Sequence, residues 1–136
     1  MKKTKKFVSH QNDTFSGVRS FKSSSRQDNK SELDIMMKKA IDHYTNNKIN
    51  DALGIIQNLL LNHPDIAILY TIKGACFVKT KQFDLALEQY HQALKITPKN
   101  ADIHYNLGVL FDEQGDFEKA VAAYLKAITF KPDAFD

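Results

Sequence analysis

A period of 34 residues runs through residues 33–134 of this 136-residue chain. Three kinds of residue recur. Small residues stand where two helices must approach closely, large residues stand where the gap between neighbouring hairpins must be filled, and a proline ends each copy. The last two copies carry them at Gly108, Ala120, Tyr124, Ala127 and Pro132, and at Gly74, Ala86, Tyr90, Ala93 and Pro98. The first copy follows the same register less closely, with Ala40, Ala52, Ile56, Leu59 and Pro64. A period of this length indicates stacked units, each of which buries its apolar face only against its neighbours.

Each copy predicts two helices joined by a tight turn. In the last copy, apolar residues at helical spacing stop at Gln114 and resume at Phe117. Gly115 can take the left-handed conformation that ends a helix, and Asp116 can cap the next one. Asn47 and Lys81 stand at the position of Gly115 in the earlier copies, and lysine suits this turn least. We predict helices over 32–45, 50–62, 65–80, 83–97, 101–114 and 117–130, with Ser31 as the cap of the first.

The period and the residue classes resemble the tetratricopeptide repeat (TPR), whose pattern is W-x2-L-G-x2-Y, A-x3-F and P over 34 residues. The last copy carries Leu107-Gly108-x2-Phe111, Ala120-x3-Tyr124 and Pro132. None of the copies has the tryptophan, and Lys73 replaces the leucine in the middle one. The resemblance implies an all-α, right-handed α-solenoid of three TPR helical hairpins. We therefore expect a TPR domain over 31–134, with repeats 33–66, 67–100 and 101–134.

The charge is unevenly distributed along the chain. Residues 1–30 carry a net charge of +6, whereas residues 31–136 carry −3. The first segment shows no sustained period and few apolar residues, so we predict a disordered basic tail. A solubilising role, a contact with an acidic partner, a phosphorylation site and a transit peptide are the alternatives for it. The negative charge of the repeats opposes binding of a polyanion, so we expect no nucleic acid partner for the repeats, and nucleic acid stays an alternative for the tail only.

The sequence shows no constellation of catalytic, cofactor-binding or metal-binding residues. No histidine is spaced i, i+4 from another histidine or cysteine, and the five glycines are scattered rather than gathered in a phosphate loop. We therefore expect no enzyme activity, no cofactor and no small-molecule substrate. The single cysteine, Cys76, is expected to be a small buried hydrophobe and suits a reducing compartment. No apolar run is long enough to span a bilayer, so we expect a cytoplasmic protein without a membrane span.

In the TPR family, the first helix of each hairpin lines a concave groove. Carried over by register, the candidate groove residues are Met37, Ile41, Tyr44, Ile68, Thr71, Val78, Tyr105, Val109 and Asp112. The face is apolar in the first two copies and acidic in the last, which implies a ligand with apolar side chains and some positive charge. The alternative is that Ile41, Ala75 and Val109 are partly covered by adjacent hairpins. The lysine and asparagine clamp with which some members hold acidic chaperone termini is not matched, because Asp102 would repel such a ligand.

The function that the resemblance implies is a TPR scaffold or adaptor that binds a protein or peptide. The alternative is the N-terminal TPR arm of a larger enzyme, such as a glycosyltransferase or sulfotransferase, with catalysis beyond residue 136. Only four residues follow Pro132, so we expect the last helix to leave part of Val121, Leu125, Ile128 and Phe130 uncovered. Self-association, a docked partner and continuation of a longer array are the three interpretations of such a surface.

Overall fold

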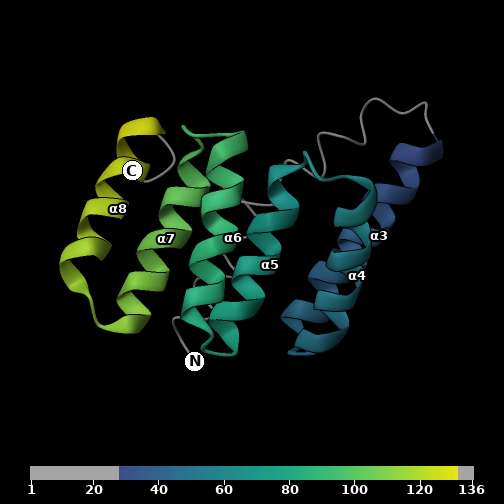
Figure 1. Ribbon diagram of the computed structural model, residues 1–136, viewed down its shortest axis with the longest axis horizontal. Coiled ribbons are helices and arrows are strands. Elements are labelled where there is room, and N and C mark those ends of the chain that lie inside the picture. The colour runs from purple at the N-terminus through teal and green to yellow at the C-terminus, as the bar shows by residue number, and fades with distance from the viewer. Residues whose placement is uncertain (1–27, 132–136) are drawn as a thin grey trace.

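The computed structural model describes residues 28–131, and these form six helices and no strand. The helices are α3 (Asp28–Thr45), α4 (Ile49–Asn62), α5 (Ala67–Lys79), α6 (Phe83–Ile96), α7 (Ala101–Gln114) and α8 (Phe117–Phe130). They stand side by side in chain order, as a row of antiparallel hairpins (Figure 1). Neighbouring hairpins pack through α4 against α5 and α6 against α7. The expected all-α solenoid of three helical hairpins is confirmed.

Five of the six helices begin and end within two residues of the predicted bounds. The exception is α3, which begins at Asp28, so that Ser31 lies inside the helix and the predicted cap there is wrong. Residues 28–30 contain no proline or glycine to stop the helix. The rest of the predicted tail, residues 1–27, lies outside the described residues.

The three turns within hairpins have the same backbone geometry. Asn47, Lys81 and Gly115 have φ angles of 64°, 63° and 83°, in the left-handed region. In each turn, the N–H of the following residue donates to the carbonyl five residues earlier, at 2.8–2.9 Å. This hydrogen bond is the mark of the Schellman motif that closes a helix. The repeat register therefore imposes a glycine-like turn even where the sequence supplies lysine.

A glycine faces a tyrosine ring inside each of the last two hairpins. A Cβ added to Gly74 would lie 2.6 Å from the ring of Tyr90, and one added to Gly108 would meet the ring of Tyr124 more closely still. Tyr90 is fully buried in this position. Because the glycine of the first helix has no side chain, the tyrosine ring of the second helix can fill the space where the two helices cross. Gly54, which is off the repeat pattern, has no atom within 4 Å of such a Cβ.

We predict that Gly108→Leu lowers the free energy of unfolding by about 1–3 kcal/mol or more, because the new side chain must displace the Tyr124 ring. Gly54→Leu makes the same change on an open helix surface and is expected to be neutral or stabilising. Urea unfolding followed by far-UV circular dichroism measures both. Equal losses in the two variants would contradict the packing described for Gly108.

The turn geometry gives a second prediction, in which glycine and lysine are exchanged between two equivalent turns. Lys81→Gly removes the strain of a left-handed lysine and is expected to raise the free energy of unfolding by up to about 1 kcal/mol. Gly115→Lys introduces that strain and is expected to lower it by about 1–2 kcal/mol. The same denaturant measurement decides, and a loss of stability in Lys81→Gly would contradict it.

Candidate functional site

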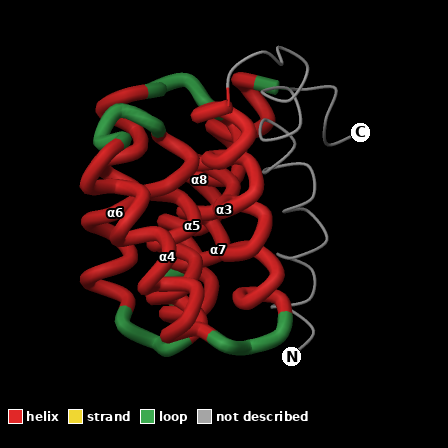
Figure 2. The backbone as a smooth tube through the Cα atoms, turned by 90° about the vertical axis from the view of Figure 1, so that its right-hand side faces the viewer, coloured by secondary structure: helices red, strands yellow, loops and turns green. Residues whose placement is uncertain are grey.

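The first helices of the hairpins share one side of the row. Seen along the row, α3 and α7 lie toward one side, and α4 and α6 lie toward the other (Figure 2). Contacts between α3 and α5, and between α5 and α7, join these first helices into a continuous wall. Six candidate groove residues on it are half-buried: Ile41, Ile68, Val78, Tyr105, Val109 and Asp112.

The other three candidates, Met37, Tyr44 and Thr71, are at most 2% exposed. Met37 and Tyr44 belong to the core cluster between the first two hairpins, which also holds Ile72 and Cys76. The hydroxyl of Thr71 donates to the carbonyl of Ala67, within its own helix. Substitutions at these three positions are therefore expected to reduce stability. Fewer residues of the wall are accessible to a ligand than the register alone predicts. The alternative that adjacent hairpins cover part of this face fits Ala75, which is buried, and Ile41 and Val109, which are partly buried and pack against the core of the first two hairpins.

Lys79 connects α5 to α3 at one end of the wall. Its Nζ lies 4.4 Å from the centroid of the Tyr44 ring and donates to the Tyr44 carbonyl at 3.5 Å. Burial lowers the pKa of Lys79, and the neighbouring Cys76 opposes this shift. Burial is also the main cause that raises the pKa of Tyr44 far above its ordinary value. The contact holds a partly desolvated cation over an aromatic face, an arrangement in which the attraction is stronger than at an exposed site.

The α7 helix makes the other end of the wall acidic. It carries Asp102, Asp112 and Glu113 and no lysine or arginine. The Tyr105 ring packs on α8, with its centroid 5.6 Å from that of Tyr124. Burial raises the pKa of Tyr124 above its ordinary value, and Asp112 and Glu113 raise it further because a carboxylate opposes formation of a nearby phenolate. Among lysine, arginine, aspartate and glutamate, α7 therefore contributes only acidic side chains to the wall.

Two buried polar side chains in the first helices lack partners within the described part of the chain. One is Asn106, whose side-chain oxygen and nitrogen both lack a hydrogen bond. The other is Asp34, whose Oδ1 lacks one. Both residues are buried. The repeat register alone could not reveal that the Asn106 side chain is buried and unpaired. A buried donor or acceptor without a partner is unusual and requires an explanation.

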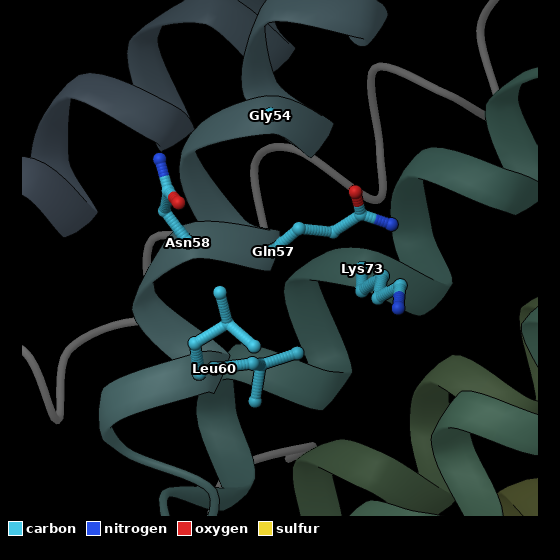
Figure 3. Close-up of a pocket in the computed structure, with 6 residues that line it drawn as sticks. Gly54, Gln57, Asn58, Leu60 and Lys73 are labelled. Carbon is cyan, nitrogen blue, oxygen red and sulfur yellow. The ribbon is translucent and has the colours of Figure 1, made fainter.

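A hollow of about 470 Å³ lies outside the candidate groove, on the surface between α4 and α5. Its lining consists of Gly54, Gln57, Asn58, Leu60, Leu61 and Lys73. Gln57 extends toward α5, where Lys73 lies, and Asn58 turns the other way (Figure 3). None of the candidate groove residues contributes to this hollow.

The described residues offer little reactive chemistry. Residues 28–131 hold no group of three or more His, Cys, Asp or Glu that could bind a metal ion. Burial raises the pKa of the Cys76 thiol to about 12, which keeps it protonated at neutral pH and agrees with a packing role. His104 is also a packing residue, since its ring lies 5.2 Å from that of Phe130 and Nε2 is 3.0 Å from the Pro98 carbonyl oxygen. No helix in this range is long and apolar enough to cross a membrane.

Comparison with known proteins finds two family models that match this chain. The model of the TPR repeat matches residues 74–115, and that of the tetratricopeptide repeat matches residues 101–134. BBSome complex member BBS4 of Bos taurus is 39% identical over 74 residues, which is 54% of this chain and 14% of that protein. The probable UDP-N-acetylglucosamine–peptide N-acetylglucosaminyltransferase SPINDLY of Solanum lycopersicum is 33% identical over 86 residues, which is 63% of this chain and 9% of that protein.

Among solved structures, the chain resembles the Yersinia enterocolitica type III secretion chaperone SycD in complex with a peptide of the translocator YopD. The TM-score is 0.67 at 20% sequence identity, with 74% of this chain and 77% of the chaperone chain covered. This likeness concerns the fold. The chain spans less than a fifth of the two curated relatives described above. Together with the helical hairpins and their Gly–Tyr crossings, the two matches show that residues 74–134 consist of tetratricopeptide repeats.

Proposed function

We propose that the chain is a protein-interaction module that binds a peptide or helix along the wall formed by α3, α5 and α7. The observation that carries the proposal is a continuous face with half-buried apolar residues and one acidic end. Ile68, Val78 and Val109 offer apolar contacts that are neither fully covered nor fully exposed. The complex of the similarly folded chaperone SycD with a peptide supports peptide binding as the kind of interaction.

The charges on the wall define the chemistry of the ligand that fits it. Asp112 and Glu113 lie at the α7 end, and neither end of α7 carries a cation. Basic side chains would be attracted to these carboxylates, and apolar side chains would cover the half-buried residues beside them. We therefore propose that the ligand is a segment with alternating apolar and basic residues.

A random peptide library displayed on phage, panned against the immobilised 136-residue chain, tests this function directly. Selected peptides are expected to combine apolar residues with lysine or arginine. Asp112→Lys should weaken the binding of a selected peptide by about tenfold, a change of about 1.4 kcal/mol, as measured by isothermal titration calorimetry. Added salt should weaken the wild-type complex, because charges at its edge are screened.

Glu88→Lys is the matched control, since it makes the same kind of charge change at an exposed position on α6, away from the wall. This variant is expected to bind as the wild type does. Peptides without basic residues, or equal losses in the two variants, would contradict the proposed site. Circular dichroism of Asp112→Lys separates a loss of binding from a loss of fold.

A second candidate function is that of a TPR arm attached to a larger enzyme. The match to the SPINDLY sequence supports it, because that protein is described as a transferase and the match covers only 9% of it. Sequencing the source DNA past the codon for Asp136 tests this function. An open reading frame that encodes a transferase domain supports it, and a stop codon directly after residue 136 rejects it.

Two further properties belong to the same proposal. We place the protein in the cytoplasm, where a lone buried thiol such as Cys76 stays reduced. The exposed apolar side of α8 is a candidate surface for self-association, separate from the wall.

A further inference from the structure

Exposed apolar side chains are concentrated on the last helix. Among the described residues, five of the nine large hydrophobic side chains that are exposed lie on α8. Phe117, Val121, Leu125 and Ile128 follow one another at spacings of four, four and three residues, which places them on one stripe of the helix. They are 45–64% exposed. This confirms the expected exposure of Val121, Leu125 and Ile128, and of Phe130, which is 37% exposed. Phe117 belongs to the same exposed surface.

Two residues of this stripe occupy repeat positions that pack between neighbouring hairpins in both earlier repeats. The residues 34 positions before Val121 and Ile128 are Leu87 and Leu94, which pack against the core between the second and third hairpins. The residues another 34 positions back, Leu53 and Leu60, do the same between the first and second hairpins. The α8 stripe can therefore pack against another helix in the way that α4 packs against α5 and α6 against α7 (Figure 1).

The stripe is also wider than stacking of hairpins requires. Leu125 stands at the position of Gln57 in α4 and His91 in α6, and both of these are polar and exposed. Stacking within the array thus leaves this position in water, so an apolar residue there gains nothing from a further hairpin. Its place in the stripe points to an interface of a different geometry.

The other end of the array does not match this surface. In α5 and α7, the side that packs on the preceding hairpin includes Ile72 and Leu110, which are buried. In α3 the corresponding positions hold Lys38 and Asp42, which are exposed. Placing α3 of one copy on α8 of another would bury these two opposite charges against Val121 and Ile128, where their attraction for each other only partly offsets the cost of desolvation. Head-to-tail stacking of copies is therefore disfavoured.

We propose that α8 pairs with α8 of a second copy of this chain, in an antiparallel dimer with twofold symmetry. A self-complementary patch is what a twofold interface requires, because each copy presents the same surface to the other. Antiparallel alignment sets Val121 against Leu125 of the partner subunit and Phe117 near Ile128 of the partner subunit. A parallel alignment would place Glu118 beside its own copy, which is unfavourable. The interface leaves the wall of α3, α5 and α7 free to bind a ligand.

Sedimentation velocity of the 136-residue chain over a wide range of concentrations tests the dimer. A reversible monomer–dimer equilibrium is expected. Leu125→Glu should raise the dissociation constant by at least about tenfold, because it places a carboxylate in the apolar stripe. Leu61→Glu is the matched control: Leu61 is 80% exposed on α4, outside the stripe, and its replacement should leave the dimer intact. If Leu125→Glu does not fold, Leu125→Gln restores the residue type found at this position in the first hairpin and takes its place.

A cross-linking measurement reports the geometry independently. In the proposed alignment Val121 faces Leu125 of the partner subunit, so a mixture of Val121→Cys and Leu125→Cys chains should form a disulfide-linked dimer rapidly with oxidised glutathione. A mixture of Val121→Cys and Leu61→Cys chains is the control, since Leu61 is exposed outside the stripe, and Cys76 is buried and should not react. A monomer at all concentrations overturns the proposal. So does equal weakening by the Leu125 and Leu61 variants, or equal cross-linking in the two mixtures.

Discussion

The contact between a glycine on one helix and a tyrosine ring on the next determines how the whole chain is built. Gly74 with Tyr90, and Gly108 with Tyr124, let two backbones approach until the ring fills the crossing. The first hairpin reaches the same result with Ala40 and Ile56, both fully buried. Each hairpin thereby becomes a rigid unit whose two outer sides are fixed relative to each other. Stacking then follows from the apolar residues of α4 and α6, and the wall of first helices follows from the stacking.

The sequence predicts the hairpins well because their signals are local. Gly115 and Asp116 mark a turn and a cap within two residues, and the structure has both, with Asp116 accepting from the Lys119 N–H. Lys81 shows the limit of local chemistry, since it adopts the same left-handed turn although glycine would suit it better. Packing of the two helices fixes the length of the turn, and the turn residue therefore adopts the left-handed conformation whatever its type.

The candidate site is predicted less well because exposure is not a local property. The register correctly places Met37 and Tyr44 on the first helix of a hairpin, but it contains no information on how closely the next hairpin approaches. In the structure, the second hairpin approaches closely enough for Lys79 to lie over the Tyr44 ring and for Met37 to join the core. Burial at these positions depends on the curvature of the array. That curvature is the sum of many interhelix contacts rather than the property of any one residue.

One position of the repeat shows how similar units acquire different roles. Its three occupants are Lys38, which is exposed at the end of the array, Ile72, which fills the core, and Asn106, which is buried without a hydrogen bond among the described residues. Ile72 demonstrates that an apolar side chain fits there, and an unpaired buried amide costs about 1–3 kcal/mol. Stability alone therefore does not account for Asn106. Asn106 is fully buried, so a ligand on the surface of the wall does not reach its amide in this arrangement of helices. The three occupants show that the neighbouring hairpins, and not the register alone, decide whether a repeat position is exposed, apolar core or a buried polar site.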